Sequence, residues 1–302
     1  MQTTRVIFLG TSSATPSRER NVSSLAMILD GHVLLFDCGE GTQHQLLRAP
    51  VRLGSLDAIF ISHLHGDHVY GLPGLLATLS LNGRTAPLPI YGPIGLGAFV
   101  EATLTTSYHH PFFDVEVIEE GEHRGDRYSV TNAPLAHSIP VLGYRVTEDD
   151  RPGRFDVARA RALGVPEGPL FGRLQAGEDV TVDGRVIRAS DVVGPSRRGR
   201  RIAYCTDTRP CDAAVELARE ADLLIHESTY GSELATEAHE RFHSTSVEAA
   251  RVAVASGAQH LVLTHFSTRY TDVTPLVEEA RGVFPNTDAA ADFACFDVPP
   301  PL

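Results

Sequence analysis

The chain has 302 residues, of which 42% are hydrophobic, 21% charged and 7% aromatic, an ordinary globular composition without low-complexity segments. The net charge of −12 by itself argues against binding of nucleic acid, because phosphate contacts need basic side chains. The four cysteines have no CxxC spacing, no basic leader is present, and no apolar run approaches the roughly 20 residues of a membrane span. We therefore expect a soluble, cytoplasmic protein that does not bind membranes.

Short apolar runs that lead to Asp, His or Glu recur along the chain. They are 33–36 before Asp37, 58–61 before His63, 202–204 before Asp207, 223–225 before His226 and Glu227, and 261–263 before His265. Runs of this length with Val and Ile are typical of strands buried on both faces. Polar residues at their ends are expected to meet at one edge of the sheets, where α/β proteins commonly bind ligands. The pattern predicts an α/β fold with a site at that edge.

Three helices are predicted between these strands. Residues 71–81 follow a histidine-rich stretch directly, and residues 211–220 form an amphipathic segment. The clearest helix start is a capping box in which Thr245 is the N-cap and Glu248 reaches back to it. Gly257 is expected to end this third helix.

Residues 148–200 differ in composition from the rest of the chain. They are rich in Gly and Pro, and residues 145–201 contain 12 Arg against 9 acidic residues, a charge of +3, whereas the remainder carries −15. We expect a single domain over residues 1–302, with 148–200 inserted between two core strands as an irregular, flexible arm. An ordinary solvated loop is the alternative.

The stretch HLHGDH at 63–68 carries the strongest chemical signal. It places four possible metal ligands within six residues, directly after a predicted strand, and its Gly lets the chain turn tightly. Imidazole and carboxylate groups suit zinc. The four candidates are His63, His65, Asp67 and His68.

Three more candidates lie at later strand or loop ends. Zinc binds about four ligands, and a catalytic site leaves one position open, so seven candidates fit two ions better than one. Two-metal sites hold their ions roughly 3.5–4 Å apart and serve the hydrolysis of phosphate esters. The sequence therefore predicts two Zn²⁺ per subunit. The three added candidates are His137, Asp207 and His265.

These motifs resemble the metallo-β-lactamase superfamily, and the rest of the chain resembles the ribonuclease Z family of tRNA 3′-processing endonucleases over nearly its whole length. The matching segments are 10–24, 36–46, 61–76, 137–144, 163–187, His226-Glu227, His243-Ser244-Thr245 and 263–270. Two departures are small. Thr206 replaces a usual Gly and Ser228 a common Ala, and neither change removes a ligand or a catalytic group.

The resemblance implies a four-layer αββα sandwich with the metals at one edge and a tRNA-binding arm. His63, His65 and His137 would hold one zinc, Asp67, His68 and His265 the other, and Asp207 would bridge them, with Asp37 orienting a ligand from behind. Asp67 is also implied as proton acceptor for the attacking water, and Glu227 with His243 as a relay to the leaving oxygen. The implied substrate-binding residues are Arg20, Asn21, Gly168 and Pro169.

The implied function is zinc-dependent removal of the 3′ trailer from precursor tRNA, leaving a 3′-hydroxyl on the tRNA and a 5′-phosphate on the trailer. The family also suggests a homodimer. Two alternatives stay open: a small-molecule hydrolase on the same fold, such as a phosphodiesterase or lactonase, and a non-catalytic RNA-binding module that keeps metals for folding. The arm disfavours the first, and the Glu227–His243 pair disfavours the second.

Overall fold

Two seven-stranded sheets form the main body of the computed structural model, which describes residues 4–301. The first sheet has the order β16-β1-β2-β3-β4-β5-β6 and the second β15-β14-β13-β12-β9-β8-β7. The first contains β1 (Thr4–Gly10), β2 (Ser24–Leu29), β3 (His32–Phe36), β4 (Leu56–Phe60), β5 (Leu88–Gly92), β6 (Val115–Glu119) and β16 (Cys295–Val298). The second contains β7 (His123–Gly125), β8 (Tyr128–Pro134), β9 (Leu142–Glu148), β12 (Arg201–Cys205), β13 (Leu223–Glu227), β14 (Leu261–Thr264) and β15 (Thr287–Ala289).

Parallel pairing within each sheet brings strand ends together. Strands β3 to β6 pair in parallel in the first sheet, and β12 to β15 do so in the second. The five predicted apolar runs lie in β3, β4, β12, β13 and β14. Their polar ends therefore gather where the carboxyl ends of these strands meet.

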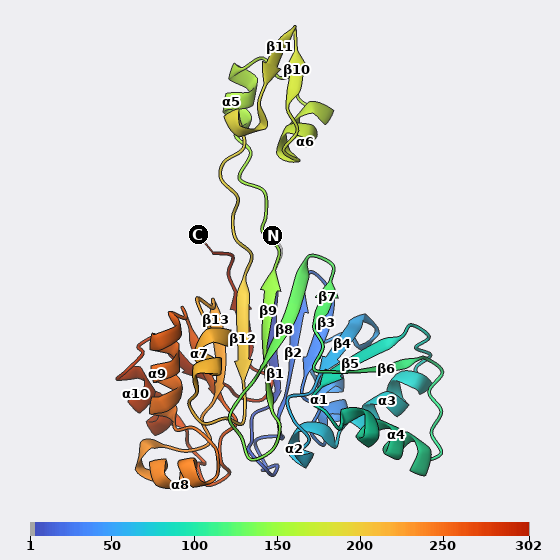
Figure 1. The fold of residues 1–302 in the computed structure, drawn as a ribbon, viewed down its shortest axis with the longest axis vertical. Coiled ribbons are helices and arrows are strands. Elements are labelled where there is room, and N and C mark those ends of the chain that lie inside the picture. The colour runs from blue at the N-terminus through green and yellow to red at the C-terminus, as the bar shows by residue number, and fades with distance from the viewer. Residues whose placement is uncertain (1–3, 302) are drawn as a thin grey trace. The chain divides into compact units, whose positions relative to one another are not determined.

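Three hydrophobic layers separate the two sheets and their helices. Alternate residues such as Phe36 and Phe60 of the first sheet and Tyr204 and Ile225 of the second form the central layer. The opposite face of the first sheet packs against helices α1, α3 and α4, and that of the second packs against α7, α9 and α10, so helices flank the sheets on both sides (Figure 1). The main body is thus the predicted four-layer αββα sandwich.

The helices start and end near the predicted residues. The capping box is confirmed: Thr245 Oγ1 accepts a hydrogen bond from Glu248 N, and Gly257 ends α9 with a φ of 69°. The main-body helices are α1 (Thr42–Arg48), α2 (Gly66–Val69), α3 (Leu72–Leu81), α4 (Leu96–Thr106), α7 (Asp212–Leu217), α8 (Ala235–Glu240), α9 (Ser246–Ser256) and α10 (Thr274–Arg281). Within residues 4–301, each helix is too short or too polar to cross a bilayer.

Residues 147–200 form a compact unit of their own. The prediction of an irregular segment is wrong: it contains α5 (Val157–Ala162), α6 (Pro169–Gln175) and a hairpin of β10 (Val180–Val182) and β11 (Arg185–Ile187). A small core around Ala160, Leu174 and Ile187 holds these elements together. Several of the Gly and Pro residues that suggested irregularity stand at element boundaries, as at Gly168, the N-cap of α6, and Gly184, which turns the hairpin with a φ of 77°.

A buried ion pair joins the first and last residues of this unit. Arg200 is the largest fully buried side chain among residues 4–301, and its Nε donates to Oε2 of Glu148 at 2.8 Å. Arg151 donates to the same oxygen at 2.8 Å. These contacts tie the first and last residues of the unit to each other.

Candidate metal centre

All seven predicted ligands converge, although they come from both sheets. The HLHGDH stretch follows β4 in the first sheet and continues into α2, whose N-cap is His65. His137 lies between β8 and β9, Asp207 follows β12 by two residues, and His265 directly follows β14. Two groups consist of predicted ligands, and in each the possible ligand atoms lie within 4.8 Å of one another. The first is His63, His65, His137 and Asp207, and the second is Asp67, His68 and His265. A third group with the same spacing joins Asp207 and His265 to His243.

The spacing of these donor atoms suits tetrahedral zinc. In the first group, His65 Nδ1 lies 3.0 Å from His63 Nε2 and 3.3 Å from His137 Nε2. In the second, His68 Nε2 lies 3.4 Å from His265 Nε2. Tetrahedral ligands about 2.1 Å from a zinc ion lie roughly 3.4 Å apart, so these distances are those of the edges of a coordination tetrahedron.

Asp207 divides its carboxylate between the two groups. Its Oδ2 lies 3.6 Å from His63 Nε2, whereas Oδ1 lies 3.1 Å from His265 Nε2. Thr206 donates a hydrogen bond to Oδ1 at 2.9 Å, which fixes the carboxylate plane. One oxygen toward each group is the arrangement that a bridging ligand needs.

Three residues of this site adopt left-handed backbone angles. The φ values of Asp37, Asp207 and His265 are 56°, 48° and 58°, and each residue lies within two positions of a strand end. Non-glycine residues seldom adopt such angles, and where they do they tend to cluster at functional sites. The sharp turns aim the three side chains across the edge of the sheets.

Four ligand histidines are held from behind through Nδ1. Ser62 Oγ lies 2.9 Å from Nδ1 of His63, the Phe242 carbonyl lies 3.0 Å from that of His137, and Thr229 Oγ1 lies 2.9 Å from that of His265. Each leaves Nε2 facing the other donors. Such outer partners fix the ring orientation and the tautomer of a metal ligand.

Asp37 is the fourth of these outer partners and lies fully buried beneath the site. Its Oδ2 is 2.8 Å from His68 Nδ1 and accepts a hydrogen bond from Tyr204 Oη, also at 2.8 Å. Its Oδ1 accepts from the Ser62 backbone N–H at 2.7 Å. A carboxylate held by this many donors fixes the orientation of the His68 ring.

The charges of the site favour a cation. Burial lowers the pKa of His63 well below its ordinary value, which keeps that ring neutral as a metal ligand requires. Burial also acts to lower the pKa of His68, but three carboxylates overcome it and raise that pKa well above the ordinary value. They belong to Asp207, Asp37 and Asp67. Three carboxylates around one ring leave an excess of negative charge, which a bound cation would offset. The imidazole and carboxylate donors suit a metal ion in this place.

An acid–base pair lies beside the ligands. His243 Nδ1 is 2.9 Å from Oε1 of Glu227, which is completely buried. Burial acts to lower the pKa of His243, but the Glu227 carboxylate raises it to about 9. The His243 ring lies 5.1 Å from that of His137 and 5.6 Å from that of His265, centroid to centroid. A protonated imidazole is therefore placed next to both groups of ligands.

The donors open into a cleft of about 670 Å³. Its lining residues include Asp67 and His243, and also Tyr230, Arg241 and Arg269. Arg269 is fixed by a paired contact with Glu237 and lies 5.0 Å over the Tyr230 ring. The cleft is open and polar, and cations line it together with metal ligands.

Arg20 and Asn21 have partners inside the protein. Arg20 donates to Thr11 Oγ1 at 2.7 Å and to the Ala290 carbonyl at 3.0 Å. Asn21 Nδ2 donates to the Glu40 carbonyl at 2.9 Å. The loop that they hold carries Ala14, whose N–H donates to Asp67 Oδ2 at 2.8 Å. Gly168 and Pro169, the other predicted substrate contacts, begin α6 in the 147–200 unit.

The sequence interpretation missed the residues that hold the ligands through a backbone group or a hydroxyl. They are Ala14, Ser62, Tyr204, Thr229 and Phe242. His226, whose role the sequence left open, is buried on β13 and contacts the Glu227 carbonyl through Nδ1. None of these positions carries a motif by which spacing alone could have marked it.

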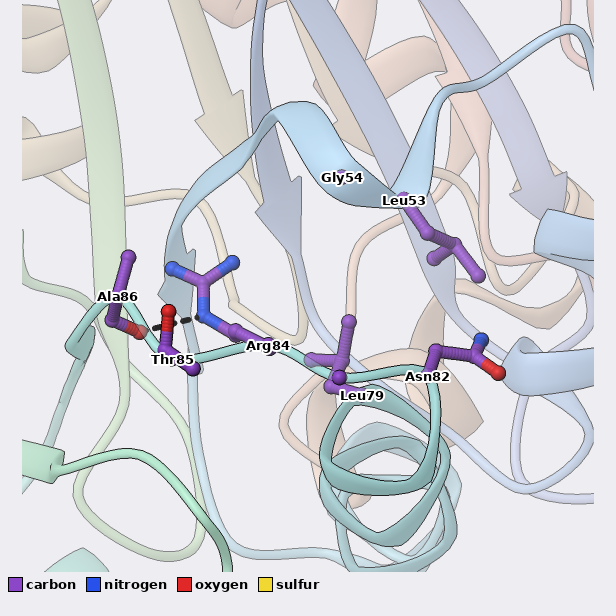
Figure 2. Close-up of a pocket in the computed structure, with 8 residues that line it drawn as sticks. Leu53, Gly54, Leu79, Asn82, Arg84, Thr85 and Ala86 are labelled. Carbon is purple, nitrogen blue, oxygen red and sulfur yellow. Dashed lines mark hydrogen bonds between the residues drawn. The ribbon is translucent and has the colours of Figure 1, made fainter.

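A second hollow, of about 350 Å³, lies between the loops at 53–54 and 82–86 (Figure 2). Its one charged side chain is Arg84. Arg84 donates to the Ala86 carbonyl, as the dashed line in Figure 2 marks, and also to the carbonyls of Leu56 and Pro87. The guanidinium thus holds the loop in place, and the hollow lacks the clustered titratable groups of the metal centre.

Known proteins match both the sequence and the fold. The model of the anti-Pycsar protein Apyc1 family matches residues 4–104, and that of the beta-lactamase superfamily domain matches residues 184–266. Ribonuclease Z of Acaryochloris marina is 50% identical over 98% of both chains. Ribonuclease Z of Gloeothece citriformis is 49% identical over 97% of this chain and 96% of its own.

Solved structures support the same grouping. The short form of human tRNase Z aligns with a TM-score of 0.72 and 31% identity, over 98% of this chain and 99% of its own. The metallo-beta-lactamase fold protein YhfI of Bacillus subtilis also aligns with a TM-score of 0.72, at 20% identity, over 98% of this chain and all of its own. The second likeness shows the fold alone.

Proposed function

The chain belongs to the ribonuclease Z family, with a metallo-β-lactamase fold, and we propose that it is a zinc-dependent endoribonuclease that cuts the 3′ trailer from precursor tRNA. The family makes it a ribonuclease. The tRNA substrate, the two zinc ions, and the 3′-hydroxyl and 5′-phosphate products are our proposal. The observation that carries it is the buried Glu227–His243 pair beside seven convergent metal donors.

The donor set divides naturally between two ions. His63, His65 and His137 would hold one zinc and Asp67, His68 and His265 the other, with Asp207 between them. When bound, two such ions lower the pKa of water and offset the negative charge of a phosphate. Asp37 keeps the His68 ring in place from below.

The chain's own groups account for the proton transfers. Asp67 Oδ2 accepts a hydrogen bond from Ala14 N, so the carboxylate is held in the lining of the cleft, where it can take a proton from the attacking water. His243, protonated and hydrogen-bonded to Glu227, can donate a proton to the departing 3′ oxygen. Glu227 stays ionised because burial, which would raise its pKa, is outweighed by His243.

The 147–200 unit is the part of the chain that we propose binds tRNA. Its basic segment can contact phosphates while the acidic remainder of the chain avoids nonspecific RNA, and tRNA is recognised mainly through shape and backbone. Phe155 and Phe171 pack on each other at 4.9 Å between centroids, so they serve the core of the unit. Gly168 and Pro169 remain our candidates for substrate contact, together with Arg20 and Asn21. We also propose a cytoplasmic homodimer.

One experiment tests the function directly. Purified protein is incubated with 5′-labelled precursor tRNA carrying a trailer, and the ends of the products are mapped, with lactones and thioesters as competing substrates. We expect a single cut at the tRNA 3′ end that a chelator abolishes and zinc restores. Turnover of a lactone without any RNA cleavage would instead identify a small-molecule hydrolase.

A further inference from the structure

Arg209 lies two residues after the bridging candidate Asp207, and its side chain contacts two other residues near the site. Its guanidinium carbon sits 3.7 Å from the centre of the Phe242 ring. Its Nε donates to the His239 carbonyl at 2.8 Å. One side chain thus holds both the end of α8 and the residue that precedes His243.

The backbone of Arg209 holds a second segment of the site. Its N–H donates to the Ala136 carbonyl at 2.9 Å, and the Ala136 N–H donates to Thr208 Oγ1 at 3.0 Å. Ala136 directly precedes His137. Arg209 therefore connects the segment that carries a metal ligand with the segment that carries the acid.

Phe242 needs such support because its backbone is strained. Its φ is 63°, in the left-handed region that non-glycine side chains seldom occupy. In this conformation its carbonyl lies 3.0 Å from His137 Nδ1, and the chain turns so that His243 Nδ1 reaches Glu227 Oε1 at 2.9 Å. Strain of this kind persists where the surroundings over-determine the conformation.

We propose that Arg209 is a positioning residue that acts through Phe242, so that one cation–π contact orients both the metal ligand His137 and the proton donor His243. The inference rests on the proposed function for its kinetic consequences only. Because the face of the guanidinium is stacked on the ring and Nε is bonded to a carbonyl, Arg209 is engaged with the protein itself. The group touches neither the donor atoms nor the Glu227 carboxylate in the contacts that the structure gives.

The first test separates positioning from substrate contact. We expect Arg209→Ala to lower kcat about 10- to 100-fold on both precursor tRNA and bis(p-nitrophenyl) phosphate, with KM changed less than about threefold. Arg219→Ala removes an exposed cation paired with Glu216 and is the matched control, expected to behave as wild type. A variant that raises KM for tRNA while leaving turnover of the small diester intact would overturn the proposal, because Arg209 would then bind RNA.

A double-mutant cycle tests the route through the ring. Phe242→Leu should reproduce the loss of kcat, and Phe242→Tyr, which keeps an aromatic face, should recover most of it. If Arg209 acts through Phe242, the double variant Arg209→Ala/Phe242→Leu is no slower than the slower single variant. Multiplicative losses would show that the two residues act independently and would contradict the proposal.

A measurement that does not depend on catalysis tests this inference separately from the proposed function. In zinc-loaded, ¹⁵N-labelled wild type, the His137 Nδ1–H bonded to the Phe242 carbonyl is expected to give a slowly exchanging ring resonance. In Arg209→Ala this resonance should disappear because the ring proton exchanges faster with solvent. Zinc content and the thermal midpoint are measured alongside to show that the variant is folded and loaded. Arg219→Ala should keep the resonance. An unchanged resonance in Arg209→Ala would overturn the inference even if RNA cleavage were proved. Loss of the resonance would support it even if the natural substrate were not tRNA.

Discussion

Nδ1 of His243 lies 2.9 Å from Oε1 of Glu227, while Oε2 of the same carboxylate accepts a hydrogen bond from Thr229 Oγ1 at 2.6 Å. The Thr229 hydroxyl is in turn 2.9 Å from Nδ1 of His265, a metal-ligand candidate. Since the hydroxyl donates to Glu227, it accepts from His265, which leaves Nε2 of that ring with its lone pair toward the other donors. One buried carboxylate thus orients both a proton donor and a metal ligand.

Replacing His243 should separate catalysis from metal binding. His243→Ala is expected to lower kcat on precursor tRNA by about 10²- to 10⁴-fold, because the leaving oxygen loses its proton donor, while the zinc content stays unchanged. Single-turnover kinetics and elemental analysis check the two parts. His110→Ala, at an exposed position, is the control. Loss of zinc from His243→Ala would contradict our division of roles.

The pH dependence of turnover should report the same group. Burial acts to lower the pKa of His243 and Glu227 raises it to about 9, so the ring stays protonated through neutral pH. We expect kcat to fall as the pH rises through about 9, with a tenfold loss per further pH unit. Glu227→Gln removes the carboxylate and should move this limb toward the ordinary histidine pKa of about 6.5. A limb at the same pH in both proteins would assign it to another group.

The raised pKa of His243 also makes the free energy of unfolding depend on pH. Because the pKa is higher in the folded than in the unfolded chain, this stability is fully present below about pH 6.5 and is lost as the pH rises through about 9.

Loss of the bridging carboxylate should empty the centre. Asp207→Ala is expected to reduce bound zinc to one ion or fewer per chain and to lower kcat at least about 10³-fold, because both groups of donors lose a shared ligand. Elemental analysis after gel filtration measures the metal. Asp212→Ala, five residues along the chain at an exposed position, should retain metal and activity. Full zinc occupancy in Asp207→Ala would show that Asp207 is not a ligand.

Removing the arm should affect large substrates only. With residues 150–195 replaced by a short Gly-Ser linker, we expect cleavage of precursor tRNA to be lost and turnover of bis(p-nitrophenyl) phosphate to persist within about threefold. The reason is that the deleted residues have a core of their own and supply none of the seven donors. Equal tRNA cleavage by the deletion variant would refute the proposed role of the arm.

Replacing the buried Glu148–Arg200 ion pair should change the stability of residues 147–200. Glu148→Met leaves the charge of Arg200 buried with one partner fewer, which is expected to cost about 3–5 kcal/mol of local stability. Hydrogen exchange over residues 147–200 measures the loss, and the small diester should be turned over as before. The double variant Glu148→Met/Arg200→Met should recover most of the stability, because it removes the uncompensated charge as well. No recovery would indicate that other contacts of these two residues dominate.

Local signals in the sequence were sufficient to predict the strands and the helix that surround the site. The short apolar runs placed β3, β4 and β12 to β14, and the Thr245–Glu248 capping box placed the start of α9. Each of these signals lies within a few residues of the feature that it predicts. The convergence of the ligands also followed, since parallel strands place their ends at one edge.

Other features depended on contacts between distant segments. No pattern in the sequence indicates that the Phe242 carbonyl orients His137, because 105 residues separate them. Within 148–200 the frequent Gly and Pro suggested irregular backbone, whereas several of them mark the ends of short elements. The core of these elements is built from residues spread over the whole segment. Arg20 was a substrate candidate, and only the fold shows its hydrogen bond to the Ala290 carbonyl.

The order of the donors along the chain has a consequence during synthesis. The last of them, His265, follows β14, and within residues 4–301 only α10, β15 and β16 come after it. A nascent chain that ends before β14 therefore has the other six candidate donors without His265. We expect such a chain to bind metal less tightly than the full donor set, so the centre would be completed late in synthesis.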